Sequence, residues 1–470
     1  MFKKITLAML AATAVYGQES HISSITDQSI QSQIIELQKE ITALQTNQDG
    51  MVKSAAPTQT KLSSVKTLET ELEKSNHVNV PTNVGHIQRF LLSDVHENIT
   101  PIGMLGSSQF ALGLLKQRNI YSNRALIFGS YLEADPQVSK NSSAKYNKGT
   151  NLSPVHQNNQ LGNGISITTA NLYITGNLGR YISAETTLAA DPSNGYNINT
   201  QEAFVMFGNI DDFPLYATLG KNRLTLGSFS GGGPRTGSLT QVLFRPSHVN
   251  NLSLAYYKDG LSSNVTLFHT KDHTSNFVYT AFYSSSTGKW LYSINGGYVY
   301  DVNGTGNKSF DLATNSDLNK TSIGAINFDA SLNYGIYGVG SGLAQTTKKS
   351  NMTNNGYAGA WYVQASLSPE VCGRLTKFNI AYNRAYNTQN LPIALSDRMQ
   401  NDHITLPKDN TSNNAAAFTY PGSGVNKMVI AFVQRPFFTE NLLLGLEYAY
   451  MHMYNNQHTN TYTLDISVHF

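Results

Sequence analysis

The sequence ends on the stretch TYTLDISVHF, residues 461–470. Five apolar residues alternate there with polar ones, and the chain stops on the last of them: Tyr462, Leu464, Ile466, Val468 and Phe470. Because successive side chains of a strand point to opposite faces, this alternation predicts a β-strand with one apolar and one polar face. An ordinary terminal strand shows the same pattern, so the rest of the chain has to decide what kind of sheet it joins.

The preceding residues repeat the pattern as a hairpin. Met428, Ile430 and Phe432 alternate before a short connection at 436–441, and a second alternating run follows it. Further short turns are predicted at 177–180, 210–214, 258–260, 333–335 and 368–373, and a weaker one at 286–288. Long polar stretches lie between the hairpins, at 135–163, 224–248, 301–320 and 387–426. Counting the runs gives at least 14 strands, and about 16 with the weaker hairpin in 277–300.

Short turns on one side and long loops on the other are typical of a transmembrane β-barrel, which also needs an even strand count. The composition agrees, since only 13% of the residues are charged, against about 25% in soluble domains. A soluble sandwich would need more polar outer faces and more even connections. The predicted fold is therefore an all-β, antiparallel transmembrane barrel of the bacterial outer membrane, and its terminal strand with a final aromatic resembles the assembly signal of such barrels.

The first 123 residues differ in character from the barrel. Residues 1–17 form a predicted signal peptide, with Lys3 and Lys4 before an apolar stretch. In 18–50 a heptad pattern predicts a short periplasmic coiled coil, which either forms a homotrimer or folds onto its own chain. Residues 51–123 are predicted as a periplasmic spacer and a pre-barrel segment, whose part 101–118 packs against or enters the barrel. The barrel itself is expected over 124–470.

The alternation also assigns a lumen face. Inward positions carry more acidic than basic residues, and an acidic pore favours cationic or metal-bearing solutes. Each residue could also be a paired lumen group without a role in selectivity. The predicted pore-lining residues are Glu133, Glu185, Glu202, Asp329, Lys377 and Glu447, with Asp465 as a further lumen carboxylate and with Lys221 and Arg223 near a strand end.

Other motifs are weaker. The glycine-rich stretch 228–237 could fold inward as a constriction, but a surface loop is the favoured interpretation. His269 with His273, and Met451-His452-Met453, offer metal-ligand types, although alternation separates His452 from its methionines. No catalytic constellation stands out and no cofactor is expected, so the chain is not predicted to be an enzyme. A thinly spread net charge of +3 gives no nucleic-acid footprint.

The predicted elements follow one another in a characteristic order. The signal peptide is followed by the helix Ile34-Ile35-Glu36-Leu37-Gln38-Lys39-Glu40-Ile41 and by the pre-barrel stretch Leu114-Leu115-Lys116-Gln117-Arg118. The barrel then begins with the strand Gly129-Ser130-Tyr131-Leu132-Glu133-Ala134-Asp135 and ends in Phe470. This organisation resembles the LbtU-type siderophore porin family, with its relatives FslE and FupA. The resemblance implies a barrel of about sixteen strands that takes up iron, as a ferric siderophore or as ferrous ion, without the TonB machinery.

Iron or an iron–siderophore is then the expected solute, and outer-membrane lipid and the barrel-assembly machinery are the expected partners. Two alternatives remain open at this point. One is a general or differently selective porin. The other is a surface or adhesin barrel that transports nothing.

Overall fold

The computed structural model describes residues 89–92 and 100–470, apart from 119, 122–123, 141–163, 192–196, 271–272, 308–309, 311–321, 351–352, 354, 390, 392–424, 455 and 457. All of the described residues fall in one compact unit. The predicted signal peptide and the predicted coiled coil in 18–50 lie outside the described residues, and so does the spacer as far as residue 88.

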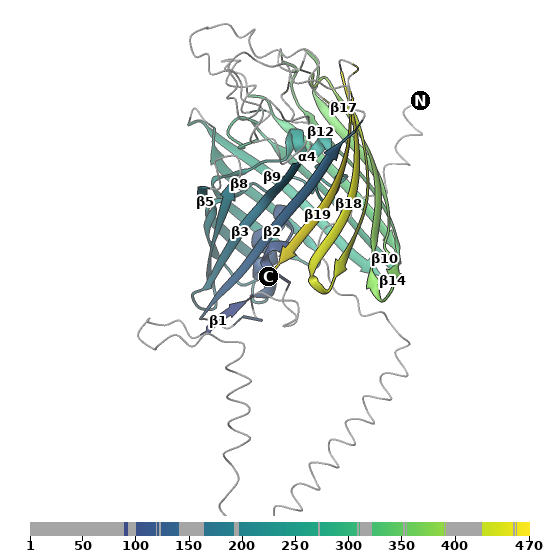
Figure 1. The fold of residues 1–470 in the computed structure, drawn as a ribbon. Coiled ribbons are helices and arrows are strands. Elements are labelled where there is room, and N and C mark those ends of the chain that lie inside the picture. The colour runs from purple at the N-terminus through teal and green to yellow at the C-terminus, as the bar shows by residue number, and fades with distance from the viewer. Residues whose placement is uncertain are drawn as a thin grey trace, which may run out of the picture. The chain divides into compact units, whose positions relative to one another are not determined.

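Sixteen antiparallel strands form a closed barrel in the described part of the chain (Figure 1). Each strand pairs with its neighbours in sequence, and the ring closes where β19 pairs with β2 from Thr461↔Ser139 to His469↔Tyr131. The terminal Phe470 extends this seam, because its N–H donates to the carbonyl of Ser130 at 3.0 Å. The predicted fold class is confirmed, and the weaker hairpin in 277–300 is real.

The strands of the ring are β2 (Ala125–Ser139), β3 (Gly164–Asn177), β4 (Ile182–Asp191), β5 (Asn197–Phe207), β6 (Leu215–Arg223), β7 (His248–Lys258), β8 (Leu261–His269), β9 (Ser275–Thr287), β10 (Trp290–Val299), β11 (Ala325–Tyr334), β12 (Tyr337–Thr346), β13 (Gly359–Leu367), β16 (Lys377–Tyr386), β17 (Val425–Phe437), β18 (Thr439–Met453) and β19 (His458–His469). A short strand β1 (Arg89–Leu92) pairs in parallel with the first residues of β2. β1 thus pairs with residues 125–128 of β2, whereas β19 pairs with residues 131–139 of the same strand.

Connections on the two sides of the barrel differ in length. Short turns join β3 to β4, β5 to β6 and each later hairpin on the side where the chain ends, and one of them contains the small hairpin β14 (Glu370–Val371) and β15 (Arg374–Leu375). The opposite side carries the long connections. We call these the turn side and the loop side. The loops predicted at 135–163 and 387–426 were too long, because β2 continues to Ser139 and β17 begins at Val425.

The outer face of the barrel is apolar. Leu254 is 58% exposed, Ile380 56% and Leu446 60%, and each alternates with buried residues on its strand. Exposed aromatic residues gather at the turn side: Tyr181, Phe213, Trp290, Tyr334, Tyr337, Phe437 and Phe438. An apolar belt edged by aromatic residues matches the lipid contact of outer-membrane barrels, in which closure leaves no unpaired strand edge. The protein is therefore located in the bacterial outer membrane.

Helices contribute little to the described fold. They are the two 3-10 turns η3 (Ile102–Met104) and η4 (Ser107–Gln109), followed by α3 (Phe110–Gln117) and α4 (Leu239–Phe244). None of the described helices is long and apolar enough to span a bilayer.

Two chain segments fill the interior of the barrel. The first, residues 100–118, contains η3, η4 and α3 and packs inside the turn-side half, and we call it the N-proximal segment. The second, residues 224–247, follows β6, contains α4 and packs inside the loop-side half, and we call it the inner loop. Each segment buries its own apolar cluster against inward residues of the wall.

Candidate functional site

The inner loop is anchored to the barrel wall by a buried carboxylate on β18. Glu447 accepts hydrogen bonds from the backbone N–H groups of Arg235 at 2.9 Å and of Thr236 at 3.1 Å. Gly233 lies so close that a Cβ there would come within 2.0 Å of the Glu447 Oε2. Glycine at position 233 therefore permits this close approach, because a Cβ there would displace the Glu447 carboxylate.

Two further wall residues bind the backbone of the same loop. Asp329 on β11 accepts from the N–H of Ser228 at 3.2 Å and from the hydroxyl of Tyr362 at 2.9 Å. Asn383 on β16 accepts from the N–H of Leu239 at 3.1 Å and donates to the carbonyl of Gly231 at 3.0 Å. Since a buried backbone group without a partner is costly, these side chains determine where the loop lies.

The second half of the inner loop forms α4. Ser238 caps it by accepting from the N–H of Gln241 at 3.1 Å, which satisfies one of the free donors of the first turn. Leu239, Leu243 and Phe244 are buried in the loop-side cluster, and the Phe244 ring lies 5.4 Å from that of Phe310. The helix thus fixes the second half of the loop by contacts with β12, β13 and β16.

The N-proximal segment is held mainly by apolar packing. Ile102, Leu112, Leu114 and Leu115 are buried against inward residues of β2, β3, β5, β6 and β7. Its last residue, Arg118, donates to the carbonyls of Gly208 at 3.0 Å and Ile182 at 3.1 Å, and also to that of Gly179. These carbonyls belong to the β3–β4 and β5–β6 turns, so Arg118 fixes the segment to the turn side.

Between the two segments the described interior leaves a cavity of about 30 Å³, which is room for about one water molecule. Phe110, Glu202, Arg223 and Thr266 are among its lining residues. Glu202 also contacts the imidazole of His248, with 2.8 Å between Oε1 and Nε2. The two segments meet where Arg245 donates to the Ser107 hydroxyl. The N-proximal segment and the inner loop thus pack in the interior of the barrel next to each other.

The structure places the six predicted pore-lining residues as follows. Glu133, Glu185, Glu202, Asp329 and Glu447 are buried on the inward face, as is Asp465. Lys377 is half-buried at the turn-side end of β16, with its Nζ 5.7 Å from the centre of the Phe432 ring. Glu185 accepts from the hydroxyls of Thr187, at 2.9 Å, and of Thr175. The carboxylates thus face the interior but belong to different contacts, and Glu447 and Asp329 accept hydrogen bonds from the backbone of the inner loop.

The two other basic residues also occupy different surroundings. Lys221 donates from its Nζ to the carbonyl of Thr200 at 2.7 Å, in an exposed position. Arg223 donates to the carbonyl of Pro246 at 3.0 Å, which ties the end of β6 to the end of the inner loop.

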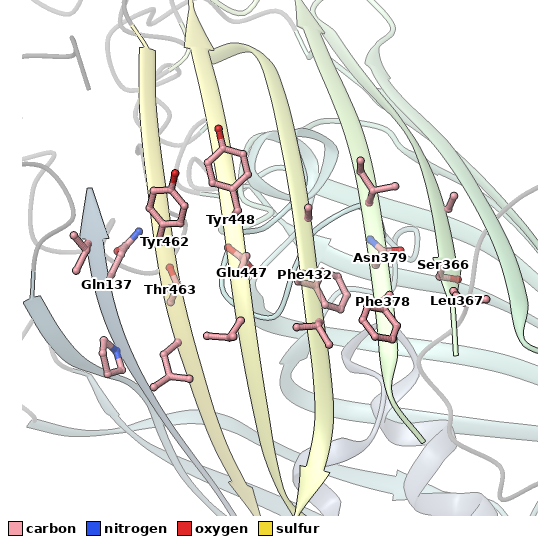
Figure 2. A pocket seen from close by; sticks show the side chains of 18 of the residues that line it. Gln137, Ser366, Leu367, Phe378, Asn379, Phe432, Glu447, Tyr448, Tyr462 and Thr463 are labelled. Carbon is pink, nitrogen blue, oxygen red and sulfur yellow. The ribbon is translucent and has the colours of Figure 1, made fainter. Parts of the chain in front are cut away.

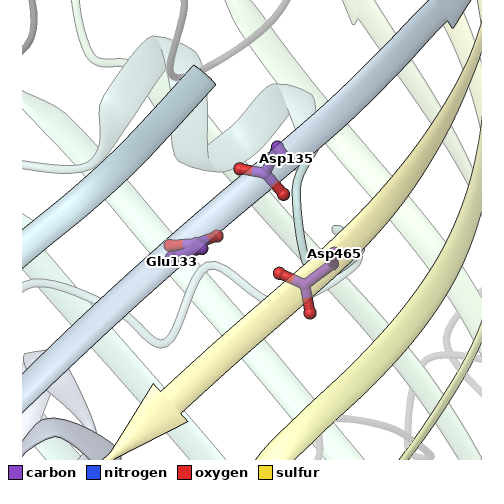
Figure 3. A group of neighbouring side chains, drawn as sticks. All are labelled: Glu133, Asp135 and Asp465. Atoms are coloured by element: carbon purple, nitrogen blue, oxygen red, sulfur yellow. The ribbon is translucent and has the colours of Figure 1, made fainter. Parts of the chain in front are cut away.

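Three inward carboxylates come together at the seam between β2 and β19 (Figure 3). Oxygen atoms of Glu133, Asp135 and Asp465 lie within 4.8 Å of one another, and none of the three residues is exposed. From the inner loop, the guanidinium of Arg235 lies 3.5 Å from Asp135. The Glu133 carboxylate also accepts from the hydroxyls of Tyr131 at 2.6 Å and Thr169 at 2.8 Å.

The histidine and methionine candidates are not part of this cluster. Met451 and Met453 are buried on the inward face, and His452 lies on the alternate positions of β18, as predicted. Across the described residues, Glu133, Asp135 and Asp465 form the one carboxylate, histidine or cysteine group with the spacing of metal ligands. The apolar residues of the predicted assembly signal, Tyr462 to Val468, occupy the outward face of β19, and Phe470 is 44% exposed.

The sequence interpretation of residues 228–237 as a surface loop was wrong. The loop lies inside the barrel because the groups that bind its backbone are on β11, β16 and β18, far away in the sequence. Asp135 was missed as a site residue because a loop was expected from that position. Its spacing of two from Glu133 was the signal that could have placed it on the same inward face. No sequence pattern predicts the position of Arg235, since it follows a proline in an irregular segment.

A shallow apolar groove runs across the outer face of β13, β16, β17, β18, β19 and the ends of β2 and β3 (Figure 2). Its exposed side chains include Phe378, Ile380, Leu446 and Leu464. Tyr448 and Tyr462 lie next to each other in it, with ring centres 5.1 Å apart. The groove lies on the lipid side and is separated from the interior by the sheet.

Several solved structures are similar to the chain at low sequence identity. OmpT of Vibrio cholerae in its trimer form is 8% identical with a TM-score of 0.43, and the match covers 73% of this chain and 99% of that one. The outer membrane channel DcaP of Acinetobacter baumannii is 8% identical with a TM-score of 0.43, covering 73% and 97%. An anion-selective porin from Comamonas acidovorans is 13% identical with a TM-score of 0.44, covering 73% and 99%.

Comparison by sequence gives a more specific result for the chain itself. No curated protein matches it. A family model described as "Protein of unknown function (DUF3573)" matches residues 78–326, which is more than half of the chain and extends from before β1 into β11. The protein is a member of the DUF3573 family.

Proposed function

We propose that the protein is a gated outer-membrane transporter for cationic solutes, with iron as its substrate. The observation that carries this proposal is the charge of the buried interior. Among the described residues, seven acidic side chains and two arginines are buried: Glu133, Asp135, Glu185, Glu202, Asp329, Glu447 and Asp465 against Arg118 and Arg235. A conduit lined mainly by carboxylates favours cations over anions.

The gate of this proposal is the inner loop. A sixteen-strand barrel has the width of an aqueous porin channel, yet the described interior is filled by two segments. A solute can therefore pass only when one of them moves. The inner loop is the better candidate, because it is attached by a limited set of polar contacts to Glu447, Asp329 and Asn383.

Iron as the solute, as ferrous ion or as a ferric siderophore, rests on the resemblance to siderophore porins together with the acidic interior. TonB-independent uptake is supported by the strand count, since the TonB-dependent transporters are 22-stranded barrels with a plug. The sixteen strands here are too few for that architecture.

The transport proposal is tested in planar bilayers with the purified protein. Under a salt gradient, the reversal potential should show preference for cations, and Glu185→Gln combined with Glu202→Gln should reduce the preference, because it removes two buried carboxylates. The matched control is Asp212→Asn, which changes an exposed turn residue paired with Arg180. Anion preference would contradict the assignment and favour a differently selective porin.

The iron assignment is tested separately by uptake into cells. Deletion of the gene should lower accumulation of radiolabelled ferrous iron or of a radiolabelled ferric siderophore, and the protein expressed from a plasmid should restore it. Unchanged uptake of both forms would remove iron as the substrate. Absence of any conductance together with loss of binding to host cells would instead indicate a surface protein.

A further inference from the structure

We propose that Glu133, Asp135 and Asp465 form a binding site for a hard divalent cation of the size of Ca²⁺, and that this ion exchanges with the guanidinium of Arg235. The inference goes beyond the proposed transport, because it concerns an ion held by the barrel wall and is measured without any transport. Its failure would leave the selectivity and iron-uptake tests unaffected.

The dimensions of the cluster fit such an ion. Ca²⁺ binds oxygen ligands at about 2.3–2.6 Å, so oxygens on opposite sides of it are separated by about 4.6–5.2 Å. The oxygen atoms of the three carboxylates lie within 4.8 Å of one another. Figure 3 shows the two carboxylates of β2 next to that of β19, across the seam that closes the barrel.

Further buried oxygen atoms beside the cluster lack a protein partner. Gln137 is 2% exposed, and neither its amide oxygen nor its amide nitrogen has a hydrogen-bond partner among the described residues. It follows Asp135 on the inward face of β2 and is paired with Thr463, whose buried hydroxyl also has no such partner. The Asp135 Oδ1 is in the same situation. Because buried polar atoms are nearly always satisfied, these atoms are available to a bound ion and its waters.

Arg235 is a counter-ion of Asp135, but its guanidinium forms no hydrogen bond with that carboxylate. Its side chain is fully buried, yet none of its guanidinium nitrogens has a hydrogen-bond partner in the described part of the chain. The 3.5 Å to Asp135 exceeds the 2.7–2.9 Å of a good charged hydrogen bond. A guanidinium held mainly by charge can be displaced by a divalent ion that binds the same carboxylates.

Oxygen-only ligands determine the class of ion. Carboxylate and amide oxygens suit Ca²⁺, Mg²⁺ and Mn²⁺, whereas softer metals select nitrogen and sulfur ligands. Mg²⁺ requires near-ideal octahedral geometry at about 2.0–2.1 Å and loses its waters reluctantly, whereas Ca²⁺ accepts flexible oxygen sites. We therefore expect Ca²⁺ to bind more strongly than Mg²⁺.

The experiment is equilibrium dialysis of the full, EDTA-treated protein against radiolabelled Ca²⁺, with Mg²⁺ as a competitor. Wild type should bind one Ca²⁺ per chain. Asp135→Asn and Asp465→Asn should each weaken binding at least tenfold, whereas Asp212→Asn should leave it unchanged. Arg235→Gln should tighten binding about tenfold, because it removes the competing cation and does not alter the barrel wall.

Three results would overturn the proposal: wild type binds no Ca²⁺, binding survives in Asp465→Asn, or Arg235→Gln binds no more tightly than wild type. The first and third of these do not depend on whether variants of the wall residues fold. Heat-dependent migration in gel electrophoresis shows which of the wall variants fold.

Discussion

The two halves of the barrel interior are filled in different ways. On the turn side, the N-proximal segment buries Ile102, Leu112, Leu114 and Leu115 against apolar residues of the wall. On the loop side, the inner loop also has an apolar helix, but its glycine-rich first half is bound through Glu447, Asp329 and Asn383. Apolar contacts dominate on the turn side, where Arg118 adds hydrogen bonds to backbone carbonyls. On the loop side, hydrogen bonds from the loop backbone to buried carboxylates add to the apolar contacts.

This difference separates a static part from a part that can be switched. Apolar packing is lost only when the surface returns to water or lipid, at a cost that increases with the buried area. A carboxylate that holds backbone N–H groups can be released by a proton, a cation or water. The loop-side half is therefore where gating is expected, and the turn-side half is where stability is expected.

The largest expected effect is on stability, from Leu115→Ala. Leu115 is 3% exposed within the turn-side cluster, and truncation of a buried leucine costs about 2–5 kcal/mol. Unfolding in guanidinium chloride should show this loss, while the cation preference in bilayers stays as in wild type. Lys116→Ala, an exposed neighbour on α3, is the control. Equal stability of the Leu115 variant would mean that the N-proximal segment is not packed in the barrel.

A somewhat smaller effect, on gating, is expected from Glu447→Ala. The variant removes the acceptor of the N–H groups of Arg235 and Thr236, and hydrogen bonds to charged groups contribute about 1.5–3 kcal/mol each. The closed state should lose at least about 1.4 kcal/mol of stability relative to the open state. The open probability of single channels should therefore rise about tenfold. Glu440→Ala, at the exposed turn-side end of β18, should gate as wild type does. An unchanged open probability would refute the anchoring role of Glu447.

The smallest effect is expected from Arg118→Lys. Lysine keeps the charge but lacks the planar fork that reaches the carbonyls of Gly208, Gly179 and Ile182. Burial also lowers the pKa of Arg118 from its usual value, although the group stays charged at neutral pH. We expect a loss of about 1 kcal/mol in the free energy of unfolding and no change in open probability. Altered gating in this variant would show that the two halves are coupled.

The fold was largely predictable because each barrel strand carries a period of two and each turn has local chemistry. The inward position of Glu133, Glu185 and Asp329 followed from the same alternation. The position of the inner loop did not, because the groups that bind its backbone come from three distant strands, β11, β16 and β18, and the loop has no periodicity. The seam cluster was only partly predictable, since Asp135-Pro136 reads as a turn although β2 continues through it to Ser139. The homotrimer inferred from residues 18–50 stays a prediction.

In the proposed gating, the inner loop closes the barrel and must move for conduction. The Asn295 amide donates to the Ser228 hydroxyl at 3.1 Å, which joins the loop to β10. Cysteines at both positions, with the exposed Cys372 replaced by serine, allow the loop to be locked by a disulfide. Single-channel recording should show no openings in the oxidised protein and their return on reduction. Equal conductance in the oxidised and reduced forms, or no conductance in either, would show that the inner loop does not gate conduction.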